Sequence, residues 1–199
     1  MKSSTKLNSL ALALALALPL AAQAESNISS VNVPPGTSLT TNAHVDFSIV
    51  IPKILFLRVG SAGAGIDSIV FNVPAASVGN TTPIAGTGGD LTGGVVTAIV
   101  QANSGTVTLN AQAAGALLNG AGDSISHSQI TTASNNPNLP APVLSDATSA
   151  NVTLTPTAKL VNQSAQWTYS YSNSAVVPAG TYGGVNVNNG RVTYQATMP

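Results

Sequence analysis

The feature that most constrains this chain is the apolar stretch from Val45 to Gly60, V-D-F-S-I-V-I-P-K-I-L-F-L-R-V-G. In its first half apolar residues alternate with Asp46 and Ser48, the pattern of a β-strand with one buried face. After Pro52 a nearly continuous apolar run follows, which is typical of a strand buried on both faces. Both halves need cover, and either this chain or a neighbour must supply it.

Residues 1–24 have the pattern of a secretory signal peptide. Lys2 and Lys6 precede an apolar run from Leu10 to Leu18, and Ala22-Gln23-Ala24 places small residues at the cleavage site. The apolar run is shorter than the roughly 20 residues that span a bilayer. No second such run follows, so we expect an exported chain without a membrane anchor.

The composition excludes several classes of function. The chain has no cysteine, which rules out disulfides, a lipid-modified cysteine and a thiolate metal site. Only six basic and six acidic residues are present, and two of the basic ones lie in the leader. Such sparse charge offers no surface for nucleic acid or anionic membrane. A surface of Ser, Thr, Asn and Gln suits a protein that packs against copies of itself.

The rest of the chain divides into an extended arm, residues 25–44, and one domain, residues 45–199. Alternating or apolar segments predict short strands, and the turn Asn103-Ser104-Gly105 predicts that two of them form a hairpin. Residues 80–94, rich in Gly, Thr and Pro, are expected to be a loop. No helix of ordinary length is indicated, so we expect an all-β, antiparallel β-sandwich. The predicted strands are 66–73, 95–101, 106–113, 124–132, 151–155, 157–162, 166–172 and 191–198.

The aromatic residues are the main candidates for the core. Trp167, Tyr169 and Tyr171 alternate along Q-W-T-Y-S-Y-S and therefore share one face of a strand. Facing outward, this row could stack on sugar rings; facing inward, it would bury the largest side chains of the chain. With so few aromatics available, we favour the core for these three, and for Tyr182 and Tyr194 as well.

No catalytic, metal or cofactor site is predicted. His44 and His127 are the only histidines, too few with no cysteine for a zinc site. His127 follows Asp123 among several serines, but alternation along a strand sends neighbouring side chains to opposite faces, so a Ser-His-Asp triad is not indicated. The glycine-rich run 86–90 lacks the spacing of a dinucleotide fingerprint and the lysine of a P-loop.

Two segments resemble a known family. The stretch 45–60 is similar to the start of mature alpha-class, colonisation-factor type pilins, where an alternating strand and a proline lead into an apolar strand. The ending P-A-G-T-Y-G-G…R-V-T-Y-Q-A-T-M-P resembles the last strands of the same subunits and of spore-coat-U-like archaic chaperone-usher pilins. A second resemblance, to WxL-type surface proteins, involves the Trp-bearing strand; here the motif is Trp167-Thr168-Tyr169, and peptidoglycan attachment is not supported.

The pilin resemblance implies a fold, a mechanism and partners. The fold would be an immunoglobulin-like sandwich lacking its last strand, covered first by a periplasmic chaperone and then, at the outer-membrane usher, by a neighbour's donated strand. The donated side chains would be Val45, Phe47, Ile49 and Ile51. The expected function is then an exported, non-enzymatic subunit of a surface fibre that contributes to adhesion.

Two alternatives remain open from the sequence. Residues 45–51 could instead be the first strand of a self-complete sandwich. The protein would then be a secreted binding module for carbohydrate or a host-surface protein, using loops such as residues 80–94. A hydrolase is a third possibility, and it would require a cleft with convergent polar groups.

Overall fold

The computed structural model describes residues 26–32, 36 and 38–199, so the predicted signal peptide lies outside the described residues. The chain divides into two units, and the boundary falls between Ile51 and Pro52. The folded domain therefore begins at Pro52 rather than at Val45. Among the described residues the fold is all-β with only two short 3₁₀ turns, and no helix there is long and apolar enough to cross a membrane.

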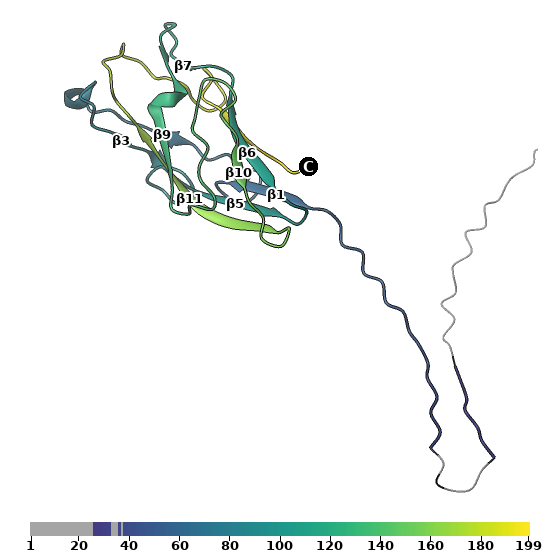
Figure 1. The fold of residues 1–199 in the computed structure, drawn as a ribbon. Helices are drawn as coiled ribbons and strands as arrows, with labels where there is room; N and C mark the ends of the chain where they lie inside the picture. The colour runs from purple at the N-terminus through teal and green to yellow at the C-terminus, as the bar shows by residue number, and fades with distance from the viewer. Residues whose placement is uncertain (1–25, 33–35, 37) are drawn as a thin grey trace, which may run out of the picture. The chain divides into compact units, whose positions relative to one another are not determined.

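All strand pairs in the domain are antiparallel, and the two larger sheets organise it (Figure 1). The first sheet has the order β1-β5-β11-β3, with β9 also paired to β11. The second has the order β10-β6-β12. The first comprises β1 (Leu55–Val59), β3 (Ile84–Ala85), β5 (Val95–Ala102), β9 (Ile130–Ser134) and β11 (Val161–Tyr171), and the second β6 (Val107–Ala113), β10 (Val152–Leu154) and β12 (Val192–Thr197).

The remaining elements are short and lie outside these two sheets. β2 (Ile69–Val70) pairs with β4 (Thr87–Gly88), and β7 (Leu117–Leu118) pairs with β8 (Ser124–Ile125). The 3₁₀ turns are η1 (Ala75–Ser77) and η2 (His127–Gln129). Residues 80–94, expected to be a loop, thus contain β3 and β4. The strand predicted over 124–132 is interrupted by η2, whose N-cap Ser126 side chain accepts from the N–H of Ser128.

One hydrophobic core joins the inward faces of both larger sheets. The buried residues of β5, β6 and β11 fall only at alternate positions, as period-2 alternation requires of a strand with one covered face. Trp167 is fully buried at its centre, and its indole Nε1–H donates to the carbonyl oxygen of Leu139 at 3.1 Å. The core side chains from the strands are Val96, Ala98, Val100, Ala102, Val107, Leu109, Ala111, Leu154, Val161, Ala165, Trp167 and Tyr169.

The predicted hairpin across Asn103-Ser104-Gly105 is wrong. β5 pairs with β1 and β11, whereas β6 pairs with β10 and β12, so the turn carries the chain from one sheet to the other. The reason is that both strands direct apolar residues into the same core. Alternation predicts which face of each strand is buried, but it does not say whether the two buried faces lie side by side or opposite one another.

The apolar run after Pro52 also differs from expectation. It forms β1, which lies at the edge of the first sheet rather than buried on both faces. Leu55 is 38 % exposed and Phe56 is 45 % exposed. β1 therefore has a sequence typical of a strand buried on both faces, but the described part of the chain leaves it partly exposed.

Candidate assembly surface

The outer edge of β1 carries unpaired backbone groups. Among the described residues β1 pairs only with β5, in the register Leu57↔Val100. Ile54 and Gly60, which flank β1, donate their N–H groups toward the β5 side. Ile54 donates to Asn103 Oδ1, and Gly60 donates to the carbonyl oxygen of Thr97. Because successive residues of a strand point their backbone groups in opposite directions, Leu55, Leu57 and Val59 direct theirs to the open edge. That edge is a template for another strand.

The outer edge of β12 is open in the same way. In the part of the chain that the structure describes, β12 pairs only with β6, in the register Tyr194↔Ala111. Its inward-facing residues pack against the core but are only partly buried, in contrast to the fully buried residues of β6. These inward residues are Val192, Tyr194 and Ala196 in the strand and Met198 just after it.

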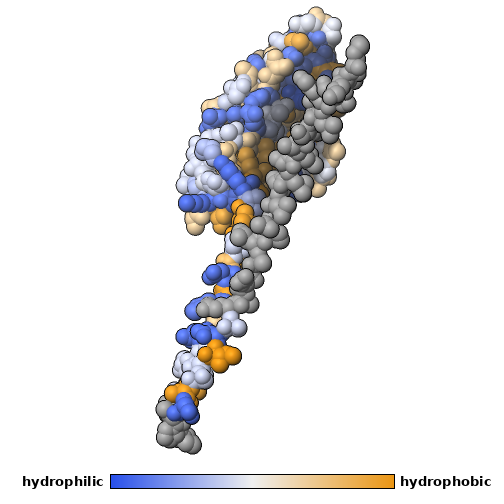
Figure 2. Space-filling view, turned by 90° about the vertical axis from the view of Figure 1, so that its right-hand side faces the viewer, coloured by the Kyte–Doolittle hydropathy of each residue, from blue (hydrophilic) through white to orange (hydrophobic). Residues whose placement is uncertain are grey.

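The two open edges lie beside each other. Cα atoms of β1 and β12 approach within 8 Å, yet no ladder joins the strands. We call the two unpaired edges, with the inward side chains of both strands, the open seam. Figure 2 faces the side of the domain on which β1 and the C-terminal end lie in Figure 1, and it shows apolar surface there next to polar residues.

A pair of tyrosines joins the inward face of β12 to the first sheet. The hydroxyl groups of Tyr169 in β11 and Tyr194 in β12 are 2.7 Å apart, and the Tyr194 ring lies 5.4 Å from that of Trp167. Burial raises the pKa of Tyr194 to about 12. Burial, together with the neighbouring Tyr194, also raises the pKa of Tyr169. The pair therefore links β11 of the first sheet to β12, the open edge strand of the second.

The other predicted aromatic residues differ in their placement. Tyr171 is buried, and its ring centroid lies 6.3 Å from that of Phe71. Tyr182 is not in the core: it is partly exposed, and its hydroxyl donates to the carbonyl oxygen of Pro178 at 2.8 Å. Tyr182 belongs to no strand, so the alternation that predicts a buried face does not apply to it.

The arm that precedes the domain carries the candidate donor residues. Residues 38–51 belong to no strand of the described chain, so Val45–Ile51 is not the first strand of a self-complete sandwich. All four candidate side chains are exposed, Phe47 to 88 %. Along this segment apolar residues stand among polar ones (Figure 2). Exposed apolar side chains at period 2 are unusual in a free chain and indicate a surface that becomes covered.

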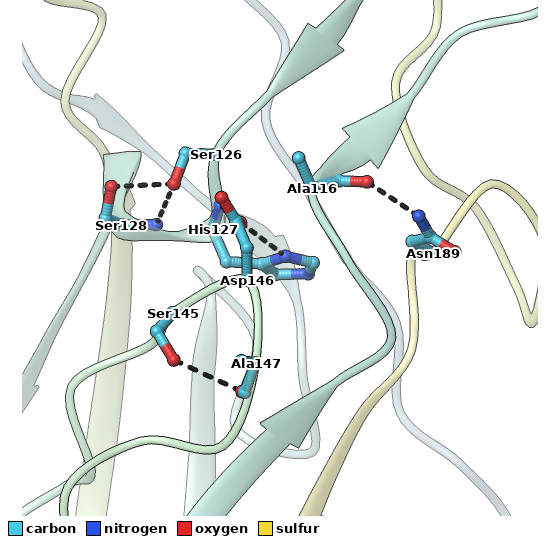
Figure 3. A network of polar contacts seen from close by, with 8 residues as sticks. All are labelled: Ala116, Ser126, His127, Ser128, Ser145, Asp146, Ala147 and Asn189. Carbon is cyan, nitrogen blue, oxygen red and sulfur yellow. Dashed lines mark hydrogen bonds and ion pairs between the residues drawn. The ribbon is translucent and has the colours of Figure 1, made fainter.

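His127 does not form a catalytic arrangement with its neighbours (Figure 3). Asp146 Oδ1 accepts from the backbone N–H of His127 at 2.7 Å and lies 3.5 Å from the imidazole Nδ1. Burial raises the pKa of Asp146, but hydrogen bonds from His127 and Ser126 outweigh it and leave the pKa below its usual value. Ser126 and Ser128 bond to each other, and neither imidazole nitrogen has a hydrogen-bond partner. The triad geometry is therefore absent here.

The glycine-rich run and its aspartate are structural. Asp90 Oδ1 accepts from the backbone N–H of Thr97 at 2.8 Å, and Gly94 donates its N–H to the carbonyl oxygen of Gly88 at 2.9 Å. The part of the chain that the structure describes contains no group of three or more His, Cys, Asp or Glu residues able to hold a metal ion. A surface pocket of about 280 Å³ is lined by Pro, Asn, Thr and Gln, with no titratable side chain.

Comparison with other proteins adds no assignment: no protein-family model, curated protein or solved structure matches this chain. Sequence reasoning identified the arm residues but not the open edges. The sequence feature that could have indicated the open edge of β1 is the apolar run 54–59. Its pattern predicts burial on both faces, and the rest of the chain buries it only in part.

Proposed function

We propose that this chain is an exported structural subunit of a surface fibre, assembled by β-strand complementation and contributing to adhesion. Its domain would be an immunoglobulin-like antiparallel sandwich that lacks one strand. The observation that carries the proposal is that one chain combines two neighbouring unpaired strand edges with an unpaired, alternating apolar segment. The open seam needs a strand, and the arm of another copy supplies one of suitable pattern.

The energetics favour such an exchange. Burying each apolar side chain contributes about 1.5–3 kcal/mol, so Val45, Phe47, Ile49 and Ile51 together could contribute on the order of 6–12 kcal/mol before the costs of association. The main-chain ladder satisfies the edge groups of both β1 and β12 in addition. A strand between two neighbours keeps them about 9.6 Å apart, twice the usual spacing. Edges that now approach within 8 Å therefore part slightly as the strand enters.

The same surface defines the partners. A chain with both an exposed seam and an exposed apolar arm would aggregate during transit, so we expect a periplasmic chaperone to cover the seam until an outer-membrane usher promotes exchange. The final occupant is a second copy of this chain or another fibre subunit. Export, the cell-surface location and the role in adhesion are parts of this proposal and follow the pilin resemblance.

The test uses the full mature chain and a peptide of residues 43–51. Purified alone, the chain should form multimers that resist heat. An excess of the peptide, added during refolding, should cap the seams and reduce the multimers to monomers. A control peptide with Phe47→Asp and Ile49→Asp should have no effect. A stable monomer that ignores the peptide would contradict the proposal and favour a self-complete binding module.

A further inference from the structure

Asn103, the first residue after β5, holds the chain just before β1. Its Nδ2 donates to the carbonyl oxygen of Pro52 at 2.7 Å, and its Oδ1 accepts from the backbone N–H of Ile54 at 2.8 Å. In an antiparallel ladder, the two residues that flank the one opposite Lys53 would bond to these same two groups. The side-chain amide of Asn103 thus extends the β1–β5 ladder past the end of β5. Residues 52–54 continue the line of β1.

Two further features oppose a turn at this point. The Nζ of Lys53 donates to the carbonyl oxygen of Pro199, which links the start of β1 to the chain beyond β12. Pro52 has its φ fixed near −65° by its ring, whereas the tight turns that suit hairpins need a positive φ at their first central residue. We call residues 52–54 with their Asn103 and Lys53 bonds the exit clamp.

The clamp matters because only residues 52–54 separate Ile51 from β1 in the sequence. A short tether gives an effective concentration on the order of millimolar. At micromolar chain concentration, an arm free to turn back would therefore cap its own seam in preference to a neighbour's by about a thousandfold, and no fibre would grow.

We propose that the exit clamp directs the arm to a second copy by preventing a hairpin between residues 45–51 and β1. This inference rests on the proposed function and deepens it. Asn103 is a positioning residue: it bonds to the exit of the arm and has no contact with the inserted strand. Releasing the clamp should convert exchange between copies into self-capping within one copy.

The absence of native cysteine allows a direct test in the full mature chain. Ser48→Cys in the arm and Gln195→Cys on the exposed face of β12 would form a disulfide when the arm lies beside β12; Thr193→Cys tests the neighbouring register. After oxidation and denaturation, exchange between copies leaves a covalent ladder on a non-reducing gel. Self-capping leaves closed monomers of increased mobility.

The clamp variant carries Asn103→Ala and Pro52→Gly in addition to the two cysteines, and it is compared with the parent, which carries the cysteines alone. The matched control is Asn162→Ala, which removes an exposed amide of β11 bonded to Gln101 at 3.2 Å, with β5 between it and β1. The parent and the control should give the ladder, and the clamp variant should give mainly closed monomers. An unchanged ladder in the clamp variant would overturn this inference and leave the fibre function intact.

Two other outcomes are also decisive. If the parent gives no ladder in either register, the fibre function fails and the inference fails with it. The clamp variant could fail to fold, which far-ultraviolet circular dichroism would show. In that case the test uses a second variant, in which an Asn-Gly pair is inserted between Ile51 and Pro52 of the parent. It supplies a hairpin turn and leaves the Asn103 bonds in place. Closed monomers would then support the inference, and a ladder would refute it.

Discussion

Replacing Ile49 by alanine should weaken assembly far more than replacing its neighbour Val50. In the unassembled arm the two side chains are almost equally exposed, at 85 % and 89 %. In a strand they point to opposite faces. Ile49 shares its face with Phe47 and would enter the core through the open seam, whereas Val50 shares its face with Ser48 and would stay in solvent.

The size of the difference follows from the proposed burial. Truncating a buried isoleucine to alanine costs about 2–5 kcal/mol. Since about 1.4 kcal/mol corresponds to a factor of ten, Ile49→Ala should weaken each subunit contact about 30-fold to several-thousand-fold. A substitution at an exposed position changes the free energy by about 0.5 kcal/mol or less, so Val50→Ala should change it about twofold.

Sedimentation velocity over a range of chain concentrations measures this difference, and the urea concentration that dissociates the multimers provides a second readout. Both variants should keep the far-ultraviolet circular dichroism of the parent, because neither residue lies in a strand of the domain. Equal losses for the two variants would show that the arm acts by unspecific apolar contact. No loss for Ile49→Ala would refute burial in the seam.

Two predictions concern the domain itself. Because burial raises the pKa of Tyr194 to about 12 and also raises that of Tyr169, both hydroxyls ionise more readily in the unfolded chain, where the pKa is about 10. The stabilisation should be fully present below pH about 10 and should be lost as the pH rises towards 12. Replacing both tyrosines by phenylalanine should make the urea unfolding midpoint depend less on pH in this range. An unchanged pH dependence of the midpoint would contradict the prediction. Gly93→Ala and Gly94→Ala both place alanine at a positive φ, at a cost of about 1–2 kcal/mol, but only at Gly94 would the new Cβ lie 2.7 Å from Gly86 Cα. Gly94→Ala should therefore lower the urea midpoint more, and equal losses would mean that the backbone relaxes there.

The positions of the main strands could be predicted from the sequence because alternation is a local property. Q-W-T-Y-S-Y-S places Trp167, Tyr169 and Tyr171 on one face of β11, and the structure buries all three. The same reasoning identified β5, β6 and β12 within a few residues. Tyr182 was misplaced because it belongs to no strand and alternation does not apply to it.

What the sequence determined by itself is which side chains need cover: every second residue of the strands, the run that forms β1, and Val45, Phe47, Ile49 and Ile51. Only the tertiary structure decided where cover is present. It showed that β5 and β6 lie in opposite sheets, that β1 and β12 are neighbouring open edges, and that Asn103 holds the chain beside Pro52. The physical reason is that hydrophobic periodicity records the demand for burial residue by residue, whereas burial itself depends on contacts between segments far apart in the chain.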